Sequence, residues 1–519
     1  MIPRRIGLVY LPGALPCFED FGNLPTDLVC SDAMVDGKFA SEVLDMLIIP
    51  SGSLIESQSV NKQVAAEIVK MAELGKYVLG VCSGFQVLAK ETDVERLSTI
   101  PITREGLGLV DVDFKPLICT DRVKADIIDK SFLTQKIGQE VTGFHCHTYG
   151  QIILHGDSKP IIMSHAERIN YKKYSQDLIS GVANKSGNVV GVFIHGLLDH
   201  NPTITESIMK TLDINQTELA TIKQANVKLV KIIKNEIGIS TGIHQQVTLN
   251  QKAPKLIIVT ALGSGSGKTF IVTGIAGSLK KRGYKVGVIK VGGDIRDAVS
   301  SLYLIKEPMR DYSSIQIGES GWMPLEQVVE SASKDYDFLL VEGAMSAFTG
   351  LLNNNYERPM STAEVALALN ASTVLVVGCD MEGLEGALIN TLSYVKTLKA
   401  LGVNVTGVIL NKLHISYITD EINQIISQTF AKANVELLGM VSRLKLDGGG
   451  MIPEVEIRYD YFGAQALDAV EKGINIDLLT KIATSPVPRK VDYNCFTVKF
   501  KNLLTQYGLN SSEGDKEKC

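Results

Sequence analysis

The chain has 519 residues, of which 45% are hydrophobic and 21% are charged, and its formal net charge is −5 at pH 7. This length and balance predict two to four globular domains with sizeable cores. The charge is weakly negative, and no concentrated basic stripe with interleaved aromatic residues is found. Nucleic acid is therefore excluded as an expected partner.

No apolar run approaches about 18 residues, so we expect no membrane-spanning helix and no membrane partner. The N-terminal stretch MIPRRIGLVYLPG is typical of a strand and lacks the core of a signal peptide, which favours a cytoplasmic protein. The eight cysteines are scattered without a CxxC pair, which argues against a disulfide framework and a structural zinc site.

The chain opens with a βαβ pattern. Buried strands are predicted at 5–11 and 44–50, and a helix at 62–74. A further strand at the start of KYVLGVCSGFQVL (76–88) leads into a tight turn at Cys82 and then a helix. Such a turn exposes its middle side chain and places a thiol at a helix N-terminus, which lowers the thiol pKa. Cys82 is a candidate nucleophile, and the alternative is a small buried cysteine at a strand end.

Three histidines follow at the ends of predicted strands. His145 and His147 lie in GFHCH, and His195 ends GVFIH. Either stretch can supply a general base for Cys82, although a single strand-end histidine is more often structural. Residues 214–238 are predicted as a helix pair or one long helix, and 239–254 lose periodicity, which indicates a linker.

A glycine-rich turn between a strand at 255–261 and a helix at 269–279 predicts a phosphate-binding loop. Backbone N–H groups and the helix N-terminus would hold phosphate oxygens, Lys268 would reach the outer phosphates, and Thr269 would bind Mg²⁺. Leu262 stands where the strict motif has glycine, and the alternative is a flexible linker. The loop residues are Gly263, Ser264, Gly265, Ser266, Gly267, Lys268 and Thr269.

Strands continue to alternate with helices after this loop. A strand at 285–290 leads to Asp294 and Asp297, and a strand at 336–341 leads to Glu342. Acids at strand ends near a phosphate loop are candidate Mg²⁺ ligands, and the alternative for each is a solvated loop carboxylate. Further strands at 373–377 and 407–410 complete an α/β, doubly wound parallel sheet.

The first half resembles the amidotransferase domain of cobyric acid and cobyrinic acid diamide synthases. The resemblance rests on RIGLVYLPGALPCFEDFGNL, GVCSGFQVL, GFHCHTYG and GVFIHGLLD in this order. It implies a class I glutamine amidotransferase-like, flavodoxin-like domain, in which Cys82 attacks glutamine and His195 relays the proton. Gly52 and Ser83 would supply oxyanion N–H groups. Leu197 stands where triad amidotransferases carry glutamate, so the group that orients His195 is not identified.

The second half is similar to the synthetase domain of the same family and to dethiobiotin synthetases, whose phosphate loop has one extra residue. The matching stretches are DFLLVEGAMSAFTGL, STAEVALALNASTVLVVGCD and GVILNK. The resemblance implies a P-loop NTPase domain that uses ATP and Mg²⁺. Thr269, Asp294 and Glu342 would hold the metal, Lys290 would face the transferred phosphate, and Asn411 would read adenine.

The sequence departs from the family it resembles in two ways, one that concerns the substrate and one that concerns the order of the domains. The relatives carry Lys-x-Gly-Pro-Asp-Tyr-Ile-Asp where this chain has KVGGDIRD, which indicates a changed substrate-facing loop. They also place the synthetase half first, whereas here it is second. Basic side chains that follow the loop after the strand at 285–290, or the loop at Glu342, are candidates for binding substrate carboxylates. The alternative is that they are solvated charges on the surface. They are Arg296, Lys306, Arg310 and Arg358.

The sequence thus predicts an ATP-dependent ligase with glutamine as amido donor, acting on tetrapyrrole carboxylates and expected as a homodimer. The alternatives are an amide synthase for another carboxylate and an ATPase whose amidotransferase-like domain only binds. The predicted domains are an amidotransferase at 1–238, a linker at 239–254, an amide synthase at 255–480 and a mostly disordered extension at 481–519.

Overall fold

The computed structural model describes residues 4–11, 14–15, 18–53, 60–95, 100, 102–236, 253–352, 357–445 and 457–508. Residues 239–252 of the predicted linker therefore lie outside the described residues. The chain divides into two compact units. The first comprises Met1–Ser240, Lys306–Met309 and Asp447–Tyr461, and the second comprises Thr241–Ile305, Arg310–Leu446 and Phe462–Cys519. The exact domain boundaries stay a prediction.

Five parallel strands form one half of the large sheet in the first unit, in the order β2-β1-β5-β6-β15. This is the order 2-1-3-4-5 of a flavodoxin-like sheet. The strands are β1 (Ile6–Val9), β2 (Asp27–Val29), β5 (Met46–Ile49), β6 (Tyr77–Val81) and β15 (Val189–Val192). The strands predicted from the sequence at 5–11 and 44–50 are confirmed as β1 and β5.

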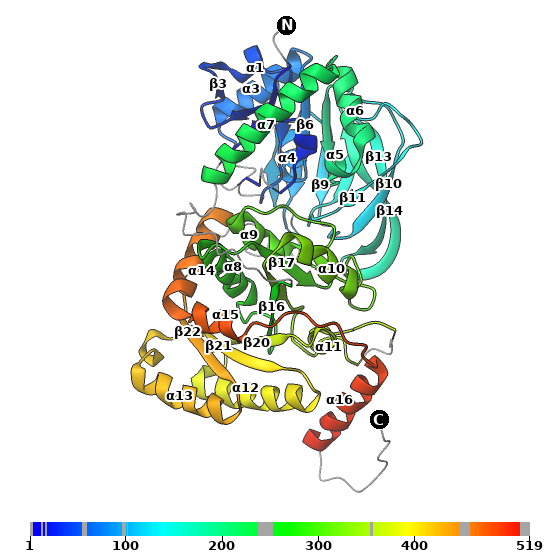
Figure 1. Ribbon diagram of the computed structural model, residues 1–519. Helices are drawn as coiled ribbons and strands as arrows, with labels where there is room; N and C mark the ends of the chain where they lie inside the picture. Colours follow the sequence, from blue (N-terminus) through cyan, green and yellow to red (C-terminus); the bar gives the residue numbers. More distant parts are fainter. Residues whose placement is uncertain are drawn as a thin grey trace. The chain divides into compact units, whose positions relative to one another are not determined.

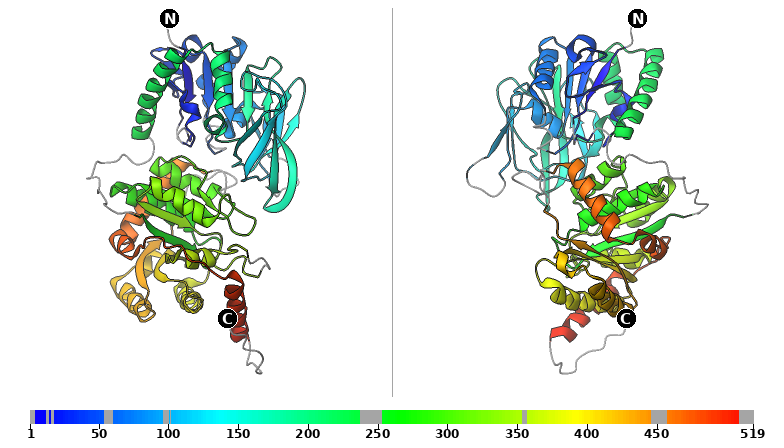
Figure 2. Two further views of the ribbon diagram at one scale, coloured as in Figure 1. Left: turned by 45° about the vertical axis from the view of Figure 1, so that its right-hand side comes forward. Right: turned by 90° about the vertical axis from the view of Figure 1, so that its left-hand side faces the viewer.

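Antiparallel strands form the other half of this sheet, in the order β11-β10-β13-β14 from its edge to β15. They are β10 (Arg122–Ile127), β11 (Glu140–Phe144), β13 (Lys159–Ile169) and β14 (Lys172–Ala183). Figure 2 shows the β13–β14 hairpin extending past its neighbours. A second sheet has the order β12-β9-β7-β8. Its strands are β12 (Gln151–Leu154), β9 (Val112–Lys115), β7 (Glu91–Asp93) and β8 (Thr103–Glu105).

The helices of the first unit begin where the sequence offers caps and apolar spacing. Helix α3 (Lys62–Glu73) is capped by Asn61, whose side chain accepts from the N–H groups of Gln63 and Val64. Its buried residues Val64, Ile68 and Met71 recur at helical spacing. Other helices are α4 (Ser83–Leu88), α5 (Leu197–His200), α6 (Pro202–Thr211) and α7 (Gln216–Glu236). Of the two predicted forms for residues 214–238, the structure has the single long helix.

Seven strands form an all-parallel sheet in the second unit, in the order β18-β17-β19-β16-β20-β21-β22. Their near-continuous apolar runs are typical of strands buried on both faces. They are β16 (Lys255–Ala261), β17 (Val286–Val291), β18 (Ser314–Ile315), β19 (Phe338–Glu342), β20 (Ser372–Gly378), β21 (Val405–Leu413) and β22 (Glu436–Ser442). The predicted doubly wound sheet is confirmed.

Helices cover both faces of the parallel sheet, as Figure 1 shows for α8 and α12. Helices α8, α9 and α15 form one group, and α10–α13 pack with the strands in one large apolar cluster. The helices are α8 (Lys268–Lys281), α9 (Arg296–Ile305), α10 (Leu325–Asp335), α11 (Thr362–Leu369), α12 (Gly383–Ala400), α13 (Asp420–Lys432), α14 (Tyr459–Gly473) and α15 (Ile476–Ile482).

The C-terminal extension corrects one expectation. Residues 481–519 were predicted to be mostly disordered, yet helix α16 (Tyr493–Gly508) buries Phe496 and Phe500 in the large apolar cluster of the second unit. The segment before it is also anchored, because the N–H of Val487 donates to the carbonyl of Leu369 at 3.1 Å. Two aromatic residues four positions apart form the apolar face of this helix. Residues 509–519 lie outside the described residues.

Candidate functional site

Cys82 occupies a sharp turn between β6 and α4. Its backbone has φ +52° and ψ −108°, a conformation that a residue with a side chain rarely adopts. Its N–H donates to the carbonyl of Val192 at 2.8 Å, and its own carbonyl accepts from Phe85 at 3.0 Å. The thiol lies at the N-terminus of α4, with Sγ 3.8 Å from the carbonyl oxygen of Cys146. This is the geometry of a nucleophile elbow.

The predicted oxyanion residues come from two neighbouring strand ends. A Cβ at Gly84 would lie 2.2 Å from the carbonyl oxygen of Ile49, so the elbow packs directly against the end of β5. Ser83 begins α4, and Gly52 follows β5 by three residues. The glycine at position 84 thus permits the close approach that brings the two turns together. That Gly52 and Ser83 bind an oxyanion stays a prediction.

His195 is held by a carboxylate that the sequence analysis did not identify. Its Nδ1 lies 2.7 Å from Oε1 of Glu19, and the N–H of Gly196 donates to Oε2 of the same carboxylate at 2.7 Å. His195 is 1% exposed and Glu19 is 5% exposed. With Nδ1 engaged, Nε2 is the nitrogen left for proton transfer, and it has no hydrogen-bond partner among the described residues.

The aromatic neighbours of His195 fix the plane of its ring. Phe144 stacks on the imidazole with ring centroids 5.2 Å apart, and Phe18 meets it edge-on at 5.1 Å. The segment that carries Glu19 is itself anchored, because Asp199 accepts from the backbone N–H groups of Asp20 and Gly22 at 2.9 Å and 2.6 Å. Burial, together with the charge of Glu19, raises the pKa of Asp199 to about 6.

The electrostatics favour a protonated His195. Complete burial alone would lower its pKa, but the charge of Cys82, together with the hydrogen bond and charge of Glu19, raises the pKa to about 10. Both interactions stabilise the imidazolium. The thiol, the imidazole and the carboxylate thus lie in one buried cluster, an arrangement that can activate a cysteine for attack on an amide. That Cys82 acts as nucleophile and His195 as base stays a prediction.

The other two predicted histidines contact different groups. Nε2 of His145 lies 3.1 Å from Oγ of Ser164 and 3.2 Å from Oγ of Ser180. Burial and the nearby His147 and His195 hold its pKa well below 6.5. Nδ1 of His147 lies 3.3 Å from the carbonyl oxygen of Leu117. Of the three, only His195 is placed on a carboxylate beside the thiol, which supports it as the base.

The phosphate-binding loop joins β16 to α8. Gly265 and Gly267 both have φ +78°, a backbone conformation that glycine adopts without strain. Oγ of Ser266 donates to the carbonyl of Gly263 at 2.8 Å and closes the turn. The side-chain amide of Asn411 donates to the carbonyl of Ser266 at 2.9 Å. Asn411 therefore supports the loop, and its predicted contact with adenine stays untested.

A charge cluster lies beside this loop. Oγ1 of Thr269 donates to Oε1 of Glu342 at 2.7 Å, and Nζ of Lys290 lies 3.3 Å from the same oxygen. Lys290 also bonds Asp297. Despite burial, the charges of Glu342 and Asp297 raise the pKa of Lys290. Burial lowers the pKa of Lys268 at the start of α8, against the attraction of Glu342.

Thr269 and Glu342 fit a magnesium ion bound with a nucleotide. Glu342 is 0% exposed, and its Oε2 has no hydrogen-bond partner among the described residues. A carboxylate oxygen beside a hydroxyl, at the end of a phosphate-binding loop, is the donor set that Mg²⁺ takes together with phosphate oxygens and water. Within the described residues, no group of three or more His, Cys, Asp and Glu is placed to hold a metal. A nucleotide would therefore complete the site.

Asp294 forms an ion pair with Arg296. Nε and Nη2 of Arg296 donate to its two carboxylate oxygens, each at 2.9 Å. The bonds of the other predicted substrate cations are to different residues. Nη1 of Arg358 donates to the carbonyl of Gly318 at 3.2 Å, and Lys306 bonds the carbonyl of Lys234. For Arg310, the backbone N–H donates to Oγ of Ser313 at 2.9 Å.

Family profiles match both units. A CobB/CobQ-like glutamine amidotransferase domain matches residues 5–203, and a CobQ/CobB/MinD/ParA nucleotide binding domain matches residues 257–447. No helix of the described residues is long and apolar enough to cross a membrane.

Curated relatives carry related names. The hydrogenobyrinate a,c-diamide synthase of Mycobacterium tuberculosis (strain ATCC 25618 / H37Rv) is 30% identical over 46% of this chain and 48% of its own length. The cobyric acid synthase of Alkaliphilus metalliredigens (strain QYMF) is 30% identical over 37% and 38%. The cobyrinate a,c-diamide synthase of Dehalococcoides mccartyi (strain ATCC BAA-2266 / KCTC 15142 / 195) is 34% identical over 30% and 32%. The chain thus spans half the length or less of the curated relatives it matches.

Solved structures are matched more distantly. PurLQS from Thermotoga maritima aligns with a TM-score of 0.31 and 21% identity, over 41% of this chain and 100% of that chain. The assignment therefore rests on the family profiles and the relatives. The chain combines a CobB/CobQ-like glutamine amidotransferase domain with a CobQ/CobB/MinD/ParA nucleotide binding domain, in that order.

Proposed function

We propose that the chain is a glutamine- and ATP-dependent ligase that amidates peripheral carboxylates of a corrin or related tetrapyrrole, as in cobalamin biosynthesis. The observation that carries this proposal is the presence of two complementary centres in one chain. The first unit holds a cysteine, a histidine and a glutamate in one buried cluster, and the second holds a phosphate-binding loop with a buried carboxylate. The names of the curated relatives support the tetrapyrrole as substrate.

In the first unit, the thiolate of Cys82 would attack the side-chain amide carbon of glutamine. His195, as imidazolium, would give its proton to the departing nitrogen, so that ammonia leaves and a thioester forms. Glu19 keeps the imidazole in place and stabilises its positive charge. Water would then hydrolyse the thioester to glutamate and restore the thiolate.

In the second unit, the loop would hold ATP, which with Mg²⁺ supplies the phosphoryl group and the charge neutralisation for its transfer. Thr269 and Glu342 would hold the metal, and Lys268 and Lys290 would face the phosphates. The substrate carboxylate would take the γ-phosphoryl group, and ammonia would displace phosphate from the resulting acyl phosphate. Activation is required because a carboxylate is a poor electrophile at neutral pH. The homodimer stays a prediction.

The test is mass spectrometry of products from cobyrinic acid, its a,c-diamide, hydrogenobyrinic acid and sirohydrochlorin, each with ATP, Mg²⁺ and glutamine. A gain of one or more amides on any of them supports the proposal, and the positions of the amides define the reaction. Hydroxylamine in place of glutamine should trap the acyl phosphate as a hydroxamate. If all four substrates stay unchanged while glutamine and ATP are hydrolysed, the substrate is a different carboxylate.

A further inference from the structure

A short arc of chain, residues 343–347, follows the end of β19 in the second unit. Both ends of the arc are bonded to β16. The N–H of Gly343 donates to the carbonyl of Val259 at 2.8 Å, and the N–H of Ala347 donates to the carbonyl of Ala261 at 3.1 Å. The two acceptors are two positions apart in one strand, a distance of about 7 Å. Five residues whose ends are held this close together must bulge outward between them.

Met345 is the middle residue of the arc, and its side chain faces solvent. Its φ is +37°, a value that a residue with a side chain rarely adopts, and the residue is 58% exposed. Its neighbours behave differently, because Ala347 is buried in the large apolar cluster of this unit and Ala344 packs against that cluster. Strained backbone of this kind is concentrated at functional sites, and packing of the unit does not require an outward methionine.

Hydrogen bonds on both sides of Met345 hold it in this conformation. The N–H of Ala344 donates to Oγ1 of Thr362 at 3.0 Å, and the N–H of Ser346 donates to Oγ1 of Thr349 at 3.3 Å. Oγ of Ser346 also lies 2.9 Å from Oγ1 of Thr349. The residues directly before and after Met345 are thus each fixed by a threonine hydroxyl. The surrounding structure therefore imposes the outward position of the thioether.

The arc lies among the groups that are proposed to hold nucleotide and metal. It follows Glu342 directly, and it is bonded to Ala261, the last residue of β16 before the phosphate-binding loop. A Cβ at Gly292 would lie 3.8 Å from Cβ of Ala344, so the arc also approaches the loop that leads from β17 to Asp294. These are the carboxyl ends of parallel strands, where open α/β sheets bind their ligands.

The order of the strands separates the arc from the predicted base. In the sheet, β19 lies on one side of β16, and β20 and β21 lie on the other. Asn411, the residue predicted to read adenine, belongs to β21. The base and the γ-phosphate are at opposite ends of a nucleotide, so the molecule that receives the phosphoryl group must approach from a different direction than the base. We expect that molecule on the β19 side, where Met345 is exposed.

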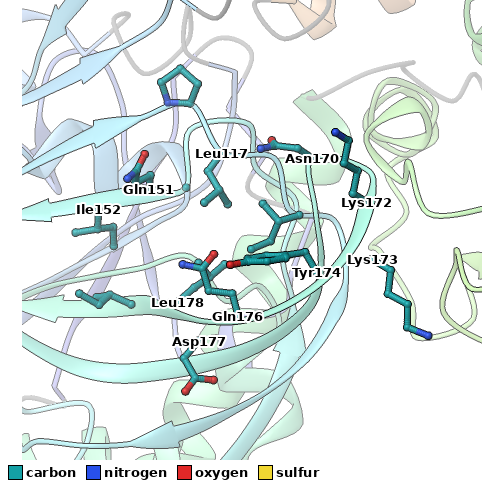
Figure 3. A pocket seen from close by; sticks show the side chains of 14 residues that line it. Leu117, Gln151, Ile152, Asn170, Lys172, Lys173, Tyr174, Gln176, Asp177 and Leu178 are labelled. Carbon is teal, nitrogen blue, oxygen red and sulfur yellow. The ribbon is translucent and has the colours of Figure 1, made fainter.

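A cavity in the first unit offers a less suitable surface for a substrate with a carboxylate. It has a volume of about 640 Å³ and lies on the inner side of the β13–β14 hairpin (Figure 3). In that view the side chains of Lys172 and Lys173 extend away from Leu117 and Leu178. The cavity therefore does not place positive charge over its apolar residues. A substrate contact is better supported in the second unit, which contains the phosphate-binding loop.

We propose that Met345 is a substrate contact, which supports an apolar face of the molecule whose carboxylate is phosphorylated. This inference rests on the proposed function, in which that molecule is a tetrapyrrole. A thioether is polarisable and unbranched, so it can adapt to a broad ring without a fixed pattern of hydrogen bonds. Met345 contributes in this way to the affinity for the substrate, and the phosphate-binding loop with Glu342 serves the nucleotide.

The test compares four full-length variants with the wild type. Met345→Gly removes the side chain at a φ that glycine adopts without strain. Met345→Gln keeps the length of the side chain and makes it polar, whereas Met345→Leu keeps it apolar. Ile425→Gln is the matched control, because Ile425 is an apolar residue with 57% exposure that lies within helix α13 and not at a strand end.

Three quantities are measured for each protein. The first is KM for the tetrapyrrole and for ATP in ammonium-supported amidation, with whichever of the four tetrapyrroles named above the wild type amidates. The second is Kd for the same tetrapyrrole by isothermal titration calorimetry, with a non-hydrolysable ATP analogue present. The third is Tm, which reports whether the fold is intact.

We expect Met345→Gly and Met345→Gln to raise KM and Kd for the tetrapyrrole about tenfold, because the apolar contact is lost. Met345→Leu should stay within about threefold of the wild type, and Ile425→Gln should stay unchanged. KM for ATP should change by less than about twofold in every variant. Tm of Met345→Gly should lie within about 2 °C of the wild type, so that weaker binding does not reflect loss of the fold.

The outcomes separate this inference from the proposed function. If the wild type amidates a tetrapyrrole and both Met345→Gly and Met345→Gln match Ile425→Gln in KM and Kd, Met345 is not a substrate contact and the proposed function stands. A rise in KM for ATP as large as that for the tetrapyrrole would place Met345 on the nucleotide and also overturn the inference. If the wild type amidates none of the four tetrapyrroles, the proposed function fails, and this role of Met345 fails with it.

Discussion

The two centres of this chain differ in what their charged side chains contact. In the first unit, Glu19 already holds His195 with Nε2 left for proton transfer beside Cys82. In the second unit, Lys290 is bonded to Asp297 and Glu342, and Asp294 is bonded to Arg296. The first centre is arranged for chemistry that needs only amino-acid side chains. In the second, these charges are paired with one another, and the proposed nucleotide and metal would have to exchange with the pairs.

Burial explains the difference. An isolated buried charge is costly, so a site that waits for a charged ligand must balance its own groups in the meantime. Lys290 and Glu342 are almost fully buried and satisfy this requirement within the second unit. In the proposed reaction, the group that reacts at the first centre is glutamine's uncharged amide, which would not exchange with an ion pair. Binding of the proposed nucleotide and metal in the second unit would break ion pairs, whereas binding of this amide in the first would not.

The largest effect is expected from Lys268→Ala. It removes the cation at the start of α8, so we expect amidation to fall by about 10³-fold or more with either glutamine or ammonium as nitrogen donor. The measurement is the rate of amide formation by mass spectrometry. Lys281→Ala, in the last turn of the same helix, is the control and should stay near the wild-type rate. A Lys268→Ala rate close to that of the control would remove this lysine from phosphoryl transfer.

Cys82→Ala tests whether the second centre can act without the thiol of the first. We expect glutamine-dependent amidation to be lost and ammonium-supported amidation to stay within about twofold, because the thiol generates ammonia but does not activate the carboxylate. Both rates are measured on the same protein preparation. Cys495→Ala should leave both unchanged. Loss of the ammonium-supported reaction in Cys82→Ala would contradict the division of labour between the units.

Glu19→Gln tests the orienting acid. We expect glutaminase kcat to fall about 100-fold or more, because the amide cannot stabilise the imidazolium as a carboxylate does. The alkaline limb of the pH–rate profile should also move to lower pH, since Glu19 helps to raise the pKa of His195 to about 10. Asp20→Asn is the matched control. An alkaline limb that does not move would show that Glu19 acts only in packing.

The raised pKa of His195 also makes the stability of the first unit depend on pH. Because the pKa of His195 is raised from 6.5 to about 10 on folding, the imidazolium stabilises the first unit fully below pH 6.5, and this contribution disappears as the pH rises through 10. The difference in Tm between wild type and Glu19→Gln should therefore be larger at pH 6 than at pH 10.5. Equal differences at the two pH values would contradict a charged pair.

The smallest effect is expected from Arg296→Ala. Asp294 must exchange this guanidinium for a metal ion, so its removal should strengthen Mn²⁺ binding to the complex with a non-hydrolysable ATP analogue. The pair is partly exposed, so we expect about a fivefold change, or about 1 kcal/mol. Titration followed by electron paramagnetic resonance measures the affinity, with Arg282→Ala as control. Unchanged or weaker binding would show that Asp294 is not a metal ligand.

Five of the seven strands of the second unit's sheet were predicted from the sequence, and β18 and β22 were not. The predicted strands are continuous apolar runs, the loop is a local motif, and Glu342 ends a strand. The strands between residues 91 and 183 carry a two-residue alternation in place of continuous apolar runs, which is a weaker signal, so the antiparallel half of the large sheet was not predicted. Helix α16 was missed because residues 480–519 were taken as one stretch that loses the hydrophobic pattern and ends in the polar run SSEGDKEKC.

In the first unit, Cys82 was a candidate from its local pattern and His195 was chosen among three strand-end histidines through the family resemblance, but Glu19 could not be found. Contacts between residues far apart in sequence leave no signal in spacing. The one available sign was a glutamate between Phe18 and Asp20 in an otherwise aromatic stretch, FEDF. An acid beside aromatic residues that become buried needs a partner, and His195 supplies it.

The distance along the chain between Glu19 and His195 determines when the thiol becomes a nucleophile during synthesis. The two residues are 176 positions apart, and Cys82 lies between them. At about 5–20 residues per second, the ribosome needs on the order of 10 s to bring His195 out after Glu19. If these residues act as proposed, the nascent chain lacks the base throughout that time. The proposed glutamine hydrolysis would then begin only after β15 has joined the sheet, and it would report that both ends of the first unit have met.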